Sequence, residues 1–128
     1  MPSKQPKKLN FRLPPYEAPR NAWRLLIHAA ALEAQSKTGV YYTASDQLSV
    51  KVLLYMPDCQ LSFHDVDNRL KDILDALQGR AGGSKAKRSL YAIIPNDNQV
   101  FRVEVEKTTP PKQSGGRGHV RIRRLKII

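Results

Sequence analysis

Hydrophobic and polar residues alternate in several short segments of the chain, and this period-two pattern predicts β-strands. The clearest predicted strand is ended by Pro57 and has apolar residues at every second position: Leu48, Val50, Val52, Leu54 and Met56. Similar alternation predicts strands over residues 9–13, 100–107 and 119–128. In the last segment the apolar phase changes after Ile122, so we expect a β-bulge at Arg123–Arg124.

Two other segments have apolar residues at helical spacing. The first predicted helix begins near Arg20, ends near Gly39 and has the apolar stripe Trp23, Leu26, Ile27, Ala30 and Ala34. The second lies between Asp65 and Gly79 and has the stripe Val66, Leu70, Ile73, Leu74 and Leu77. The order β-α-β-α-β-β predicts one small α/β domain over residues 1–128, with two main helices on a mixed sheet.

Polar segments separate these elements. We expect residues 1–8 to be loose, residues 79–89 to form a basic, glycine-rich loop and residues 108–118 to form a second loop. The apolar segment 90–94 fits either the core or a subunit interface, and the sequence does not choose between them.

Charge narrows the class of partner. The 128 residues carry 22 Lys and Arg against 11 Asp and Glu, a net charge of +11, which favours a polyanionic partner such as nucleic acid. The best apolar run, residues 25–32, is too short to span a bilayer, so no membrane partner is expected. A single cysteine, Cys59, read as a strand-end residue, allows no intrachain disulfide, and we expect a cytoplasmic protein.

The acidic residues gather where the second helix begins. Asp65 suits a helix N-cap, and negative charge suits the N-terminal end of the helix dipole. If Asp65 precedes the first turn and Asp67 lies in it, both carboxylates can face one cation, and hard oxygen ligands favour Mg²⁺ or Mn²⁺. Asp72 and Asp75 are rotated away, and we expect them on the solvated face.

Three further residues have two interpretations each. Lys71 can form an i,i+4 ion pair with Asp67 or contact a phosphate oxygen. His64 can be an exposed turn residue, or a base or outer ligand. Asp97 can be an ordinary turn residue or the third carboxylate of a metal site.

Several short motifs resemble those of RusA-type Holliday junction resolvases. They are Asp65-Val66-Asp67-Asn68, Lys71, Asp75-Ala76-Leu77 and Asn96-Asp97-Asn98-Gln99-Val100. The resemblance implies a Mg²⁺- or Mn²⁺-dependent endonuclease, usually a homodimer, that cuts four-way DNA junctions in recombination and repair. It also implies that Asp65, Asp67 and Asp97 are the catalytic, metal-binding aspartates and that Lys71 is the catalytic lysine.

Basic residues outside this motif are candidates for DNA contacts. They are Lys85, Lys87 and Arg88 in the glycine-rich loop, and Arg117, Arg121 and Arg123 near the C-terminus. Such residues contact phosphates without reading sequence, although charges on a strand can also simply guard a sheet edge. Two alternatives stay open: a nucleic-acid-binding protein without catalysis, and a nuclease for other branched DNA.

Overall fold

The computed structural model describes residues 8–57, 64–80 and 90–125, with the backbone alone at Asp97. These residues form a single small α/β domain with a four-stranded mixed sheet and two helices in the order β-α-β-α-β-β. The predicted fold class is therefore confirmed. Residues 1–7 of the predicted loose segment 1–8, Cys59 and residues 81–89 of the predicted loop lie outside the described ranges, whereas Lys8 belongs to the first strand.

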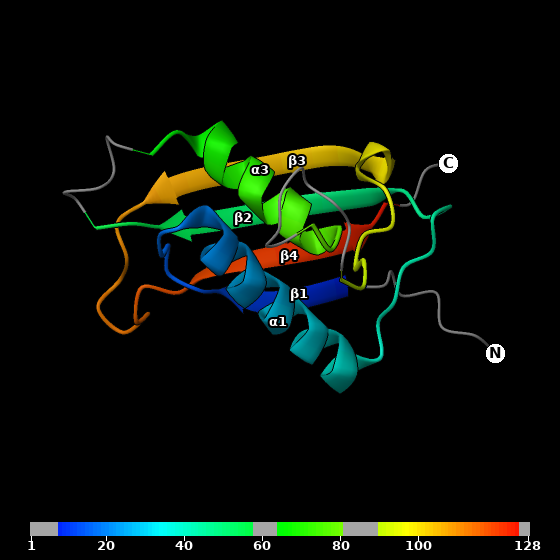
Figure 1. Ribbon diagram of the computed structural model, residues 1–128, viewed down its shortest axis with the longest axis horizontal. Coiled ribbons are helices and arrows are strands. Elements are labelled where there is room, and N and C mark those ends of the chain that lie inside the picture. Colours follow the sequence, from blue (N-terminus) through cyan, green and yellow to red (C-terminus); the bar gives the residue numbers. More distant parts are fainter. Residues whose placement is uncertain (1–7, 58–63, 81–89, 126–128) are drawn as a thin grey trace.

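The sheet has two free edges, one at each outer strand (Figure 1). Its strands are β1 (Lys8–Leu13), β2 (Leu48–Tyr55), β3 (Val100–Thr108) and β4 (Gly118–Arg124). Their spatial order is β1-β4-β2-β3. β2 and β3 are parallel, whereas β4 is antiparallel to both β1 and β2. Among the described residues, β1 and β3 therefore each have one side without a partner strand.

Both helices cover the same face of the sheet (Figure 1). α1 (Arg20–Thr38) ends at Gly39, whose φ of 71° is the left-handed conformation typical of a helix C-terminus. α3 (Val66–Leu77) connects the parallel strands β2 and β3 and therefore runs antiparallel to them. The core between the layers contains large, fully buried side chains from all of these elements except β3, including Leu9, Trp23, Ile27, Leu54, Ile73, Leu77 and Ile122.

The other face of the sheet, which we call the open face, carries charged and polar side chains. The strand registers place these residues on it: Lys8, Asn10, Arg12, Lys51, Arg102, Glu104, Glu106, His119, Arg121 and Arg123. All of them are exposed. Strands that alternate between buried and charged positions explain why the period-two pattern predicted this sheet correctly.

Two local predictions were wrong. In α1, Leu26 is 41 % exposed, and the buried face contains His28, Ala31 and Gln35 instead. His28 turns inward because its Nε2 lies 2.7 Å from the Tyr91 carbonyl oxygen, a contact with a distant segment. The expected bulge in β4 is absent, because its pairing with β1 and β2 is continuous through Arg123. The irregularity lies between β2 and β3 instead, where Ser49 pairs with Arg102.

Only the end of the segment 90–94 belongs to the core, because Tyr91 is 54 % exposed. Ile93 and Ile94 are buried, and both of their backbone amides donate to the Leu77 carbonyl, at 2.8 and 2.9 Å. Gly79 permits this approach, since a Cβ there would collide with the Leu90 carbonyl oxygen. Within the described ranges, no helix is long and apolar enough to cross a membrane.

Candidate functional site

Asp65 and Asp67 lie at the start of α3 with their side chains exposed. Asp65 is the N-cap residue in position and has extended backbone angles, but its carboxylate accepts no capping hydrogen bond. Its one described contact is the Asn68 amide, whose Nδ2 donates to Oδ2 at 3.5 Å. In the described part of the chain, neither aspartate forms an ion pair. Both carboxylates therefore retain most of their capacity to bind a cation.

Two lysines lie near these carboxylates. Lys107, at the end of β3, donates from Nζ to the His64 carbonyl oxygen at 2.6 Å, which joins the strand to the residue before Asp65. Lys71 lies one turn after Asp67 and is exposed. The i,i+4 ion pair between them is not among the ion pairs of the described residues. The Lys71 ammonium is thus available to an external anion.

His64 is half-buried, so the expectation of an exposed turn histidine is wrong. Its ring packs on Tyr16 with centroids 4.7 Å apart, and its Nδ1 lies 3.5 Å from Arg69 Nη1. Desolvation, and then the charges of Arg69 and Lys107, lower the pKa of His64 below its ordinary value of 6.5. The imidazole is consequently neutral at pH 7 and adds no positive charge next to Asp65.

Asp72 and Asp75 are not on the solvated face, which corrects the sequence-based expectation. Asp72 is fully buried between the helices, where its Oδ1 accepts from Arg20 Nε at 2.9 Å and from Arg24 Nη2 at 2.9 Å. The same Arg24 nitrogen lies 3.1 Å from Asp75 Oδ2. The two carboxylates pair with arginines from α1 and so fix the position of α3 against it.

Arg69 extends this network towards His64. Its Nη2 lies 3.2 Å from Asp72 Oδ2, which is within ion-pair distance although the alignment does not make a hydrogen bond. We regard the contact as Coulombic, because both side chains are nearly inaccessible to water. The guanidinium also stacks on the Tyr16 ring, 4.6 Å from its centroid. Apart from the i,i+3 spacing of Arg69 and Asp72, nothing in the sequence indicates these contacts.

Asp97 opens a short 3₁₀ turn, Asp97–Gln99, that precedes β3. Gln99 holds this turn: its Nε2 donates to the carbonyls of Thr43 and Asp46, at 2.9 and 2.7 Å. Its Oε1 accepts from the Asn96 amide at 2.8 Å. The buried glutamine in the Asn96–Val100 motif is therefore a structural residue that positions the backbone at Asp97.

The structure does not bring the Asp97 backbone near Asp65 within one chain. Lys107 places the C-terminal end of β3 beside His64, whereas Asp97 precedes the N-terminal end of the same strand. The eight residue steps from Val100 to Thr108 span about 26 Å at the usual rise of a strand. Figure 1 shows the same separation, with the start of α3 and the turn before β3 at opposite ends of the sheet.

The candidate DNA-binding residues are distributed over different surfaces. Arg121 and Arg123 are on the open face, which points away from the helices and therefore from the start of α3. Arg117 lies in the loop before β4, where its carbonyl oxygen accepts from Arg12 Nη2 at 2.7 Å. Lys85, Lys87 and Arg88 lie outside the described residues.

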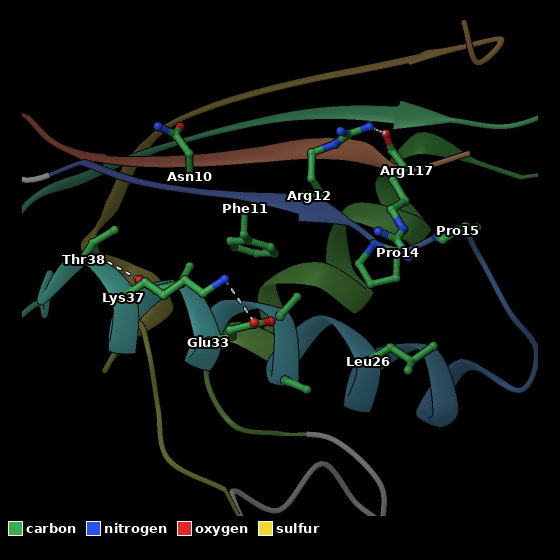
Figure 2. A pocket seen from close by; sticks show the side chains of 13 residues that line it. Asn10, Phe11, Arg12, Pro14, Pro15, Leu26, Glu33, Lys37, Thr38 and Arg117 are labelled. Carbon is green, nitrogen blue, oxygen red and sulfur yellow. Dashed lines mark hydrogen bonds and ion pairs between the residues drawn. The ribbon is translucent and has the colours of Figure 1, made fainter. Parts of the chain in front are cut away.

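A hollow lies between β1 and α1, and no residue of the acidic motif lines it (Figure 2). Its volume is about 750 Å³, and Phe11 points into it from the strand, as Figure 2 shows. Lys37 borders it but is paired with Glu33 at 3.3 Å. A second hollow of about 440 Å³ lies among Asn10, Lys51 and Arg121 of the open face. Neither contains a carboxylate without a cationic partner.

The aspartate pair fits a magnesium-type ion in part. Among the described residues, no group of three or more His, Cys, Asp or Glu side chains converges as a metal site. Mg²⁺, however, is usually held by one or two carboxylates together with waters and substrate phosphates. Asp65 and Asp67 can supply such a partial set.

No model of a known protein family matches the chain, and no curated protein matches it.

Proposed function

We propose that the protein is a metal-dependent endonuclease of the RusA type that resolves four-way DNA junctions. The observation that supports this proposal is the pair of exposed carboxylates without ion-pair partners, Asp65 and Asp67, at the start of α3. Two lysines lie in their neighbourhood, on a chain whose net charge of +11 suits a polyanion. The motif residues Asn68 and Lys71 complete the resemblance.

Each residue has a defined role in this proposal. Asp65 and Asp67 hold a Mg²⁺ or Mn²⁺ ion. Asp97, which the resemblance implies as a third ligand, lies at the opposite end of the sheet in the same chain and has no role in this site. When bound, such an ion supplies a water of lowered pKa and offsets the charge of the scissile phosphate. Lys71 contacts a phosphate oxygen and stabilises the negative charge that develops during cleavage. Lys107 orients the backbone at His64 and so the start of α3.

The basic side chains of the open face, which points away from Asp65 and Asp67, supply affinity for DNA outside the cleavage site and without sequence specificity. Lys8, Arg12, Lys51, Arg121 and Arg123 outnumber the acidic side chains of the open face, which both lie on β3. Contacts between such residues and phosphates release counterions, so DNA binding weakens steeply with salt.

A second function, nucleic-acid binding without catalysis, has one observation in its favour. Carboxylates at the N-terminal end of a helix are stabilised by the helix dipole. The negative charges of Asp65 and Asp67 are therefore stabilised at the start of α3 even without a metal ion. In that case the open face alone would bind the ligand.

A cleavage assay on matched substrates separates these functions. A synthetic four-way junction, a fork and a linear duplex of shared sequence are incubated with the protein, with Mg²⁺ and with EDTA. The proposal predicts paired cuts in the junction when Mg²⁺ is present and no cuts in EDTA. It also predicts little cleavage of the duplex. Binding of all three substrates without any cutting supports the non-catalytic function, and equal cutting of fork and junction supports a broader branched-DNA nuclease.

A further inference from the structure

The open face of the sheet is basic over three strands and acidic along one edge. Among the described residues, its carboxylates are Glu104 and Glu106, and both lie on the edge strand β3. The other three strands carry only cations among their charged open-face residues. These cations form one surface over β1, β4 and β2, which we call the basic sheet surface: Lys8, Arg12, Lys51, Arg121 and Arg123.

The strand register places like charges directly beside one another on the basic sheet surface. Arg123 on β4 lies opposite Lys8 on β1. Arg121, two residues earlier on β4, lies opposite Lys51 on β2. Like charges in directly opposed positions of neighbouring strands destabilise a sheet. Because folding alone disfavours this arrangement, it indicates a surface that binds a polyanion.

The cations of this surface keep their charge available to a ligand. Among the described residues, only Lys51 lies within ion-pair distance of a carboxylate. Arg12 Nε donates to a neutral acceptor, the Gly118 carbonyl oxygen, at 3.1 Å. Arg121 Nε likewise donates to Asn10 Oδ1 at 3.0 Å. These bonds orient the two guanidinium groups without neutralising them, so that each can still contact a phosphate.

An aromatic side chain lies among these cations. His119 on β4 is exposed, lies opposite Arg12 and borders the hollow of about 440 Å³ on the open face. Tyr55 of β2 packs against it, with ring centroids 6.1 Å apart and an angle of 82° between the planes. Desolvation, and then the charges of Arg12 and Arg121, lower the pKa of His119 below its ordinary value of 6.5. The ring is therefore neutral at pH 7 and can stack on a base.

The shape of the open face suits a single strand better than a duplex. Proteins read duplex DNA by placing a helix or a two-stranded ribbon in the major groove. Here both helices lie on the other face of the sheet, and the basic sheet surface consists of strands within the sheet (Figure 1). A cationic surface with an aromatic ring is the arrangement that binds single strands, because their bases are free to stack.

We infer that the basic sheet surface binds single-stranded nucleic acid, with a base stacked on His119 at the hollow and phosphates on Arg121 and Arg123. The surface points away from Asp65 and Asp67, so the nucleotides that it binds are not those that are cut. In the proposed nuclease it holds an unpaired strand of a branched substrate, and this role rests on the proposed function. The binding itself rests only on the charges, the aromatic pair and the hollow.

Fluorescence anisotropy in EDTA tests the binding without any cleavage. A labelled oligodeoxythymidine of about ten nucleotides is compared with the duplex that it forms with its complement. We expect the single strand to bind roughly 10-fold more tightly or better, because only its bases can reach His119.

The phosphate contacts are tested by the salt dependence of this binding. Arg121→Gln should weaken binding of the single strand and reduce the slope of log K against log salt by about 0.7, the value for one phosphate contact. Lys37→Gln removes one positive charge from α1, on the other face of the sheet, and is the matched control. It should leave the slope unchanged.

The stacked base is tested at His119. His119→Ala should weaken binding of the single strand by roughly 10-fold, and His119→Trp should restore it. In His119→Trp the oligonucleotide should also quench the fluorescence of the introduced indole. Trp23, the chain's own tryptophan, is fully buried and gives the matched background signal in the wild type. Circular dichroism confirms that each variant is folded, and the preference of the wild type for the single strand needs no variant.

Three results would each overturn the inference. They are a duplex that binds as tightly as the single strand, a folded His119→Ala protein that binds like the wild type, and equal salt slopes for Arg121→Gln and Lys37→Gln. Junction cleavage by the wild type in Mg²⁺ leaves the proposed function intact in all three cases. Conversely, a protein that binds the single strand as expected but cuts no DNA supports the inference, while the proposed function fails.

Discussion

The four aspartates of the α3 segment divide into two pairs with opposite environments. Asp72 is fully buried, Asp75 is half-buried, and both pair with arginines of α1. Asp65 and Asp67 are exposed and have no ion pair among the described residues. Within eleven positions, Asp72 and Asp75 thus hold two helices together, whereas Asp65 and Asp67 are free to bind a ligand.

This difference explains how a basic chain tolerates the acidic segment. Arg20, Arg24 and Arg69 offset the inner pair and leave the network with a surplus of positive charge. The outer pair is stabilised by the N-terminal end of the helix dipole and by neighbouring lysines. Substitutions on the two pairs should therefore change different properties, activity for the outer pair and stability for the inner pair.

The largest effect is expected at the outer pair. Asp67→Asn should lower junction cleavage by roughly 10³-fold or more, because it removes a metal ligand, while DNA binding is kept or improved. Single-turnover cleavage and a gel-shift titration measure the two properties. Asp75→Asn, a matched change on the same helix, should retain activity. Equal cleavage by wild type and Asp67→Asn would show that the outer pair is not catalytic.

At the inner pair the effect should be on folding. Asp72→Asn leaves buried arginine charges without their counter-ion and should lower the free energy of unfolding by about 3 kcal/mol. Asp67→Asn should change it by no more than about 0.5 kcal/mol, since that side chain is exposed. Urea denaturation compares the two variants. Similar losses of stability in Asp72→Asn and Asp67→Asn would show that the inner and outer pairs do not differ in their structural role.

Lys71 provides a further test of catalysis near the outer pair, Asp65 and Asp67. Lys71→Met should reduce cleavage by about 10- to 100-fold through loss of charge stabilisation. It should leave stability unchanged, because the described residues form no ion pair with Lys71. Lys37→Met, an exposed lysine of α1, serves as the control. If both variants cut the junction at the wild-type rate, Lys71 has no catalytic role.

The smallest effect is a pH dependence from His64. Its pKa is lowered in the folded protein, so between that value and 6.5 the unfolded chain binds more protons than the folded one. The contribution of His64 is therefore complete above pH 6.5 and is lost as the pH falls through the folded pKa. His64→Gln should flatten this part of the stability profile between pH 7.5 and 5. An NMR titration that gives His64 a pKa above 6.5 would contradict the geometry.

The alternating and helical patterns were sufficient to predict the fold class. Burial of one face of a sheet or helix places apolar residues at regular intervals along the sequence. The patterns could not reveal the burial of Asp72, since its partners Arg20 and Arg24 lie about fifty residues earlier in the chain. The inward position of His28 depended likewise on a distant carbonyl. Interactions between separate elements leave no local period.

One part of the site could have been anticipated from element order. In a β-α-β unit with parallel strands, the start of the helix and the start of the second strand lie at opposite ends of the sheet. Asp65 precedes α3 and Asp97 precedes β3, so the order alone separates them within a chain. The structural role of Gln99 had no such signal, because it depends on carbonyl groups of the loop before β2.

The central claim is that Asp65 and Asp67 bind a divalent cation that the chain uses on DNA. Its most direct test is a Mn²⁺ titration followed by electron paramagnetic resonance, with the wild type, Asp67→Asn and Asp75→Asn, each with and without junction DNA. We predict that the wild type and Asp75→Asn bind Mn²⁺ and that junction DNA increases their affinity for it. For Asp67→Asn we predict no Mn²⁺ binding beyond the amount that the DNA binds by itself. Equal Mn²⁺ binding by all three proteins, or none by any of them, would contradict the claim.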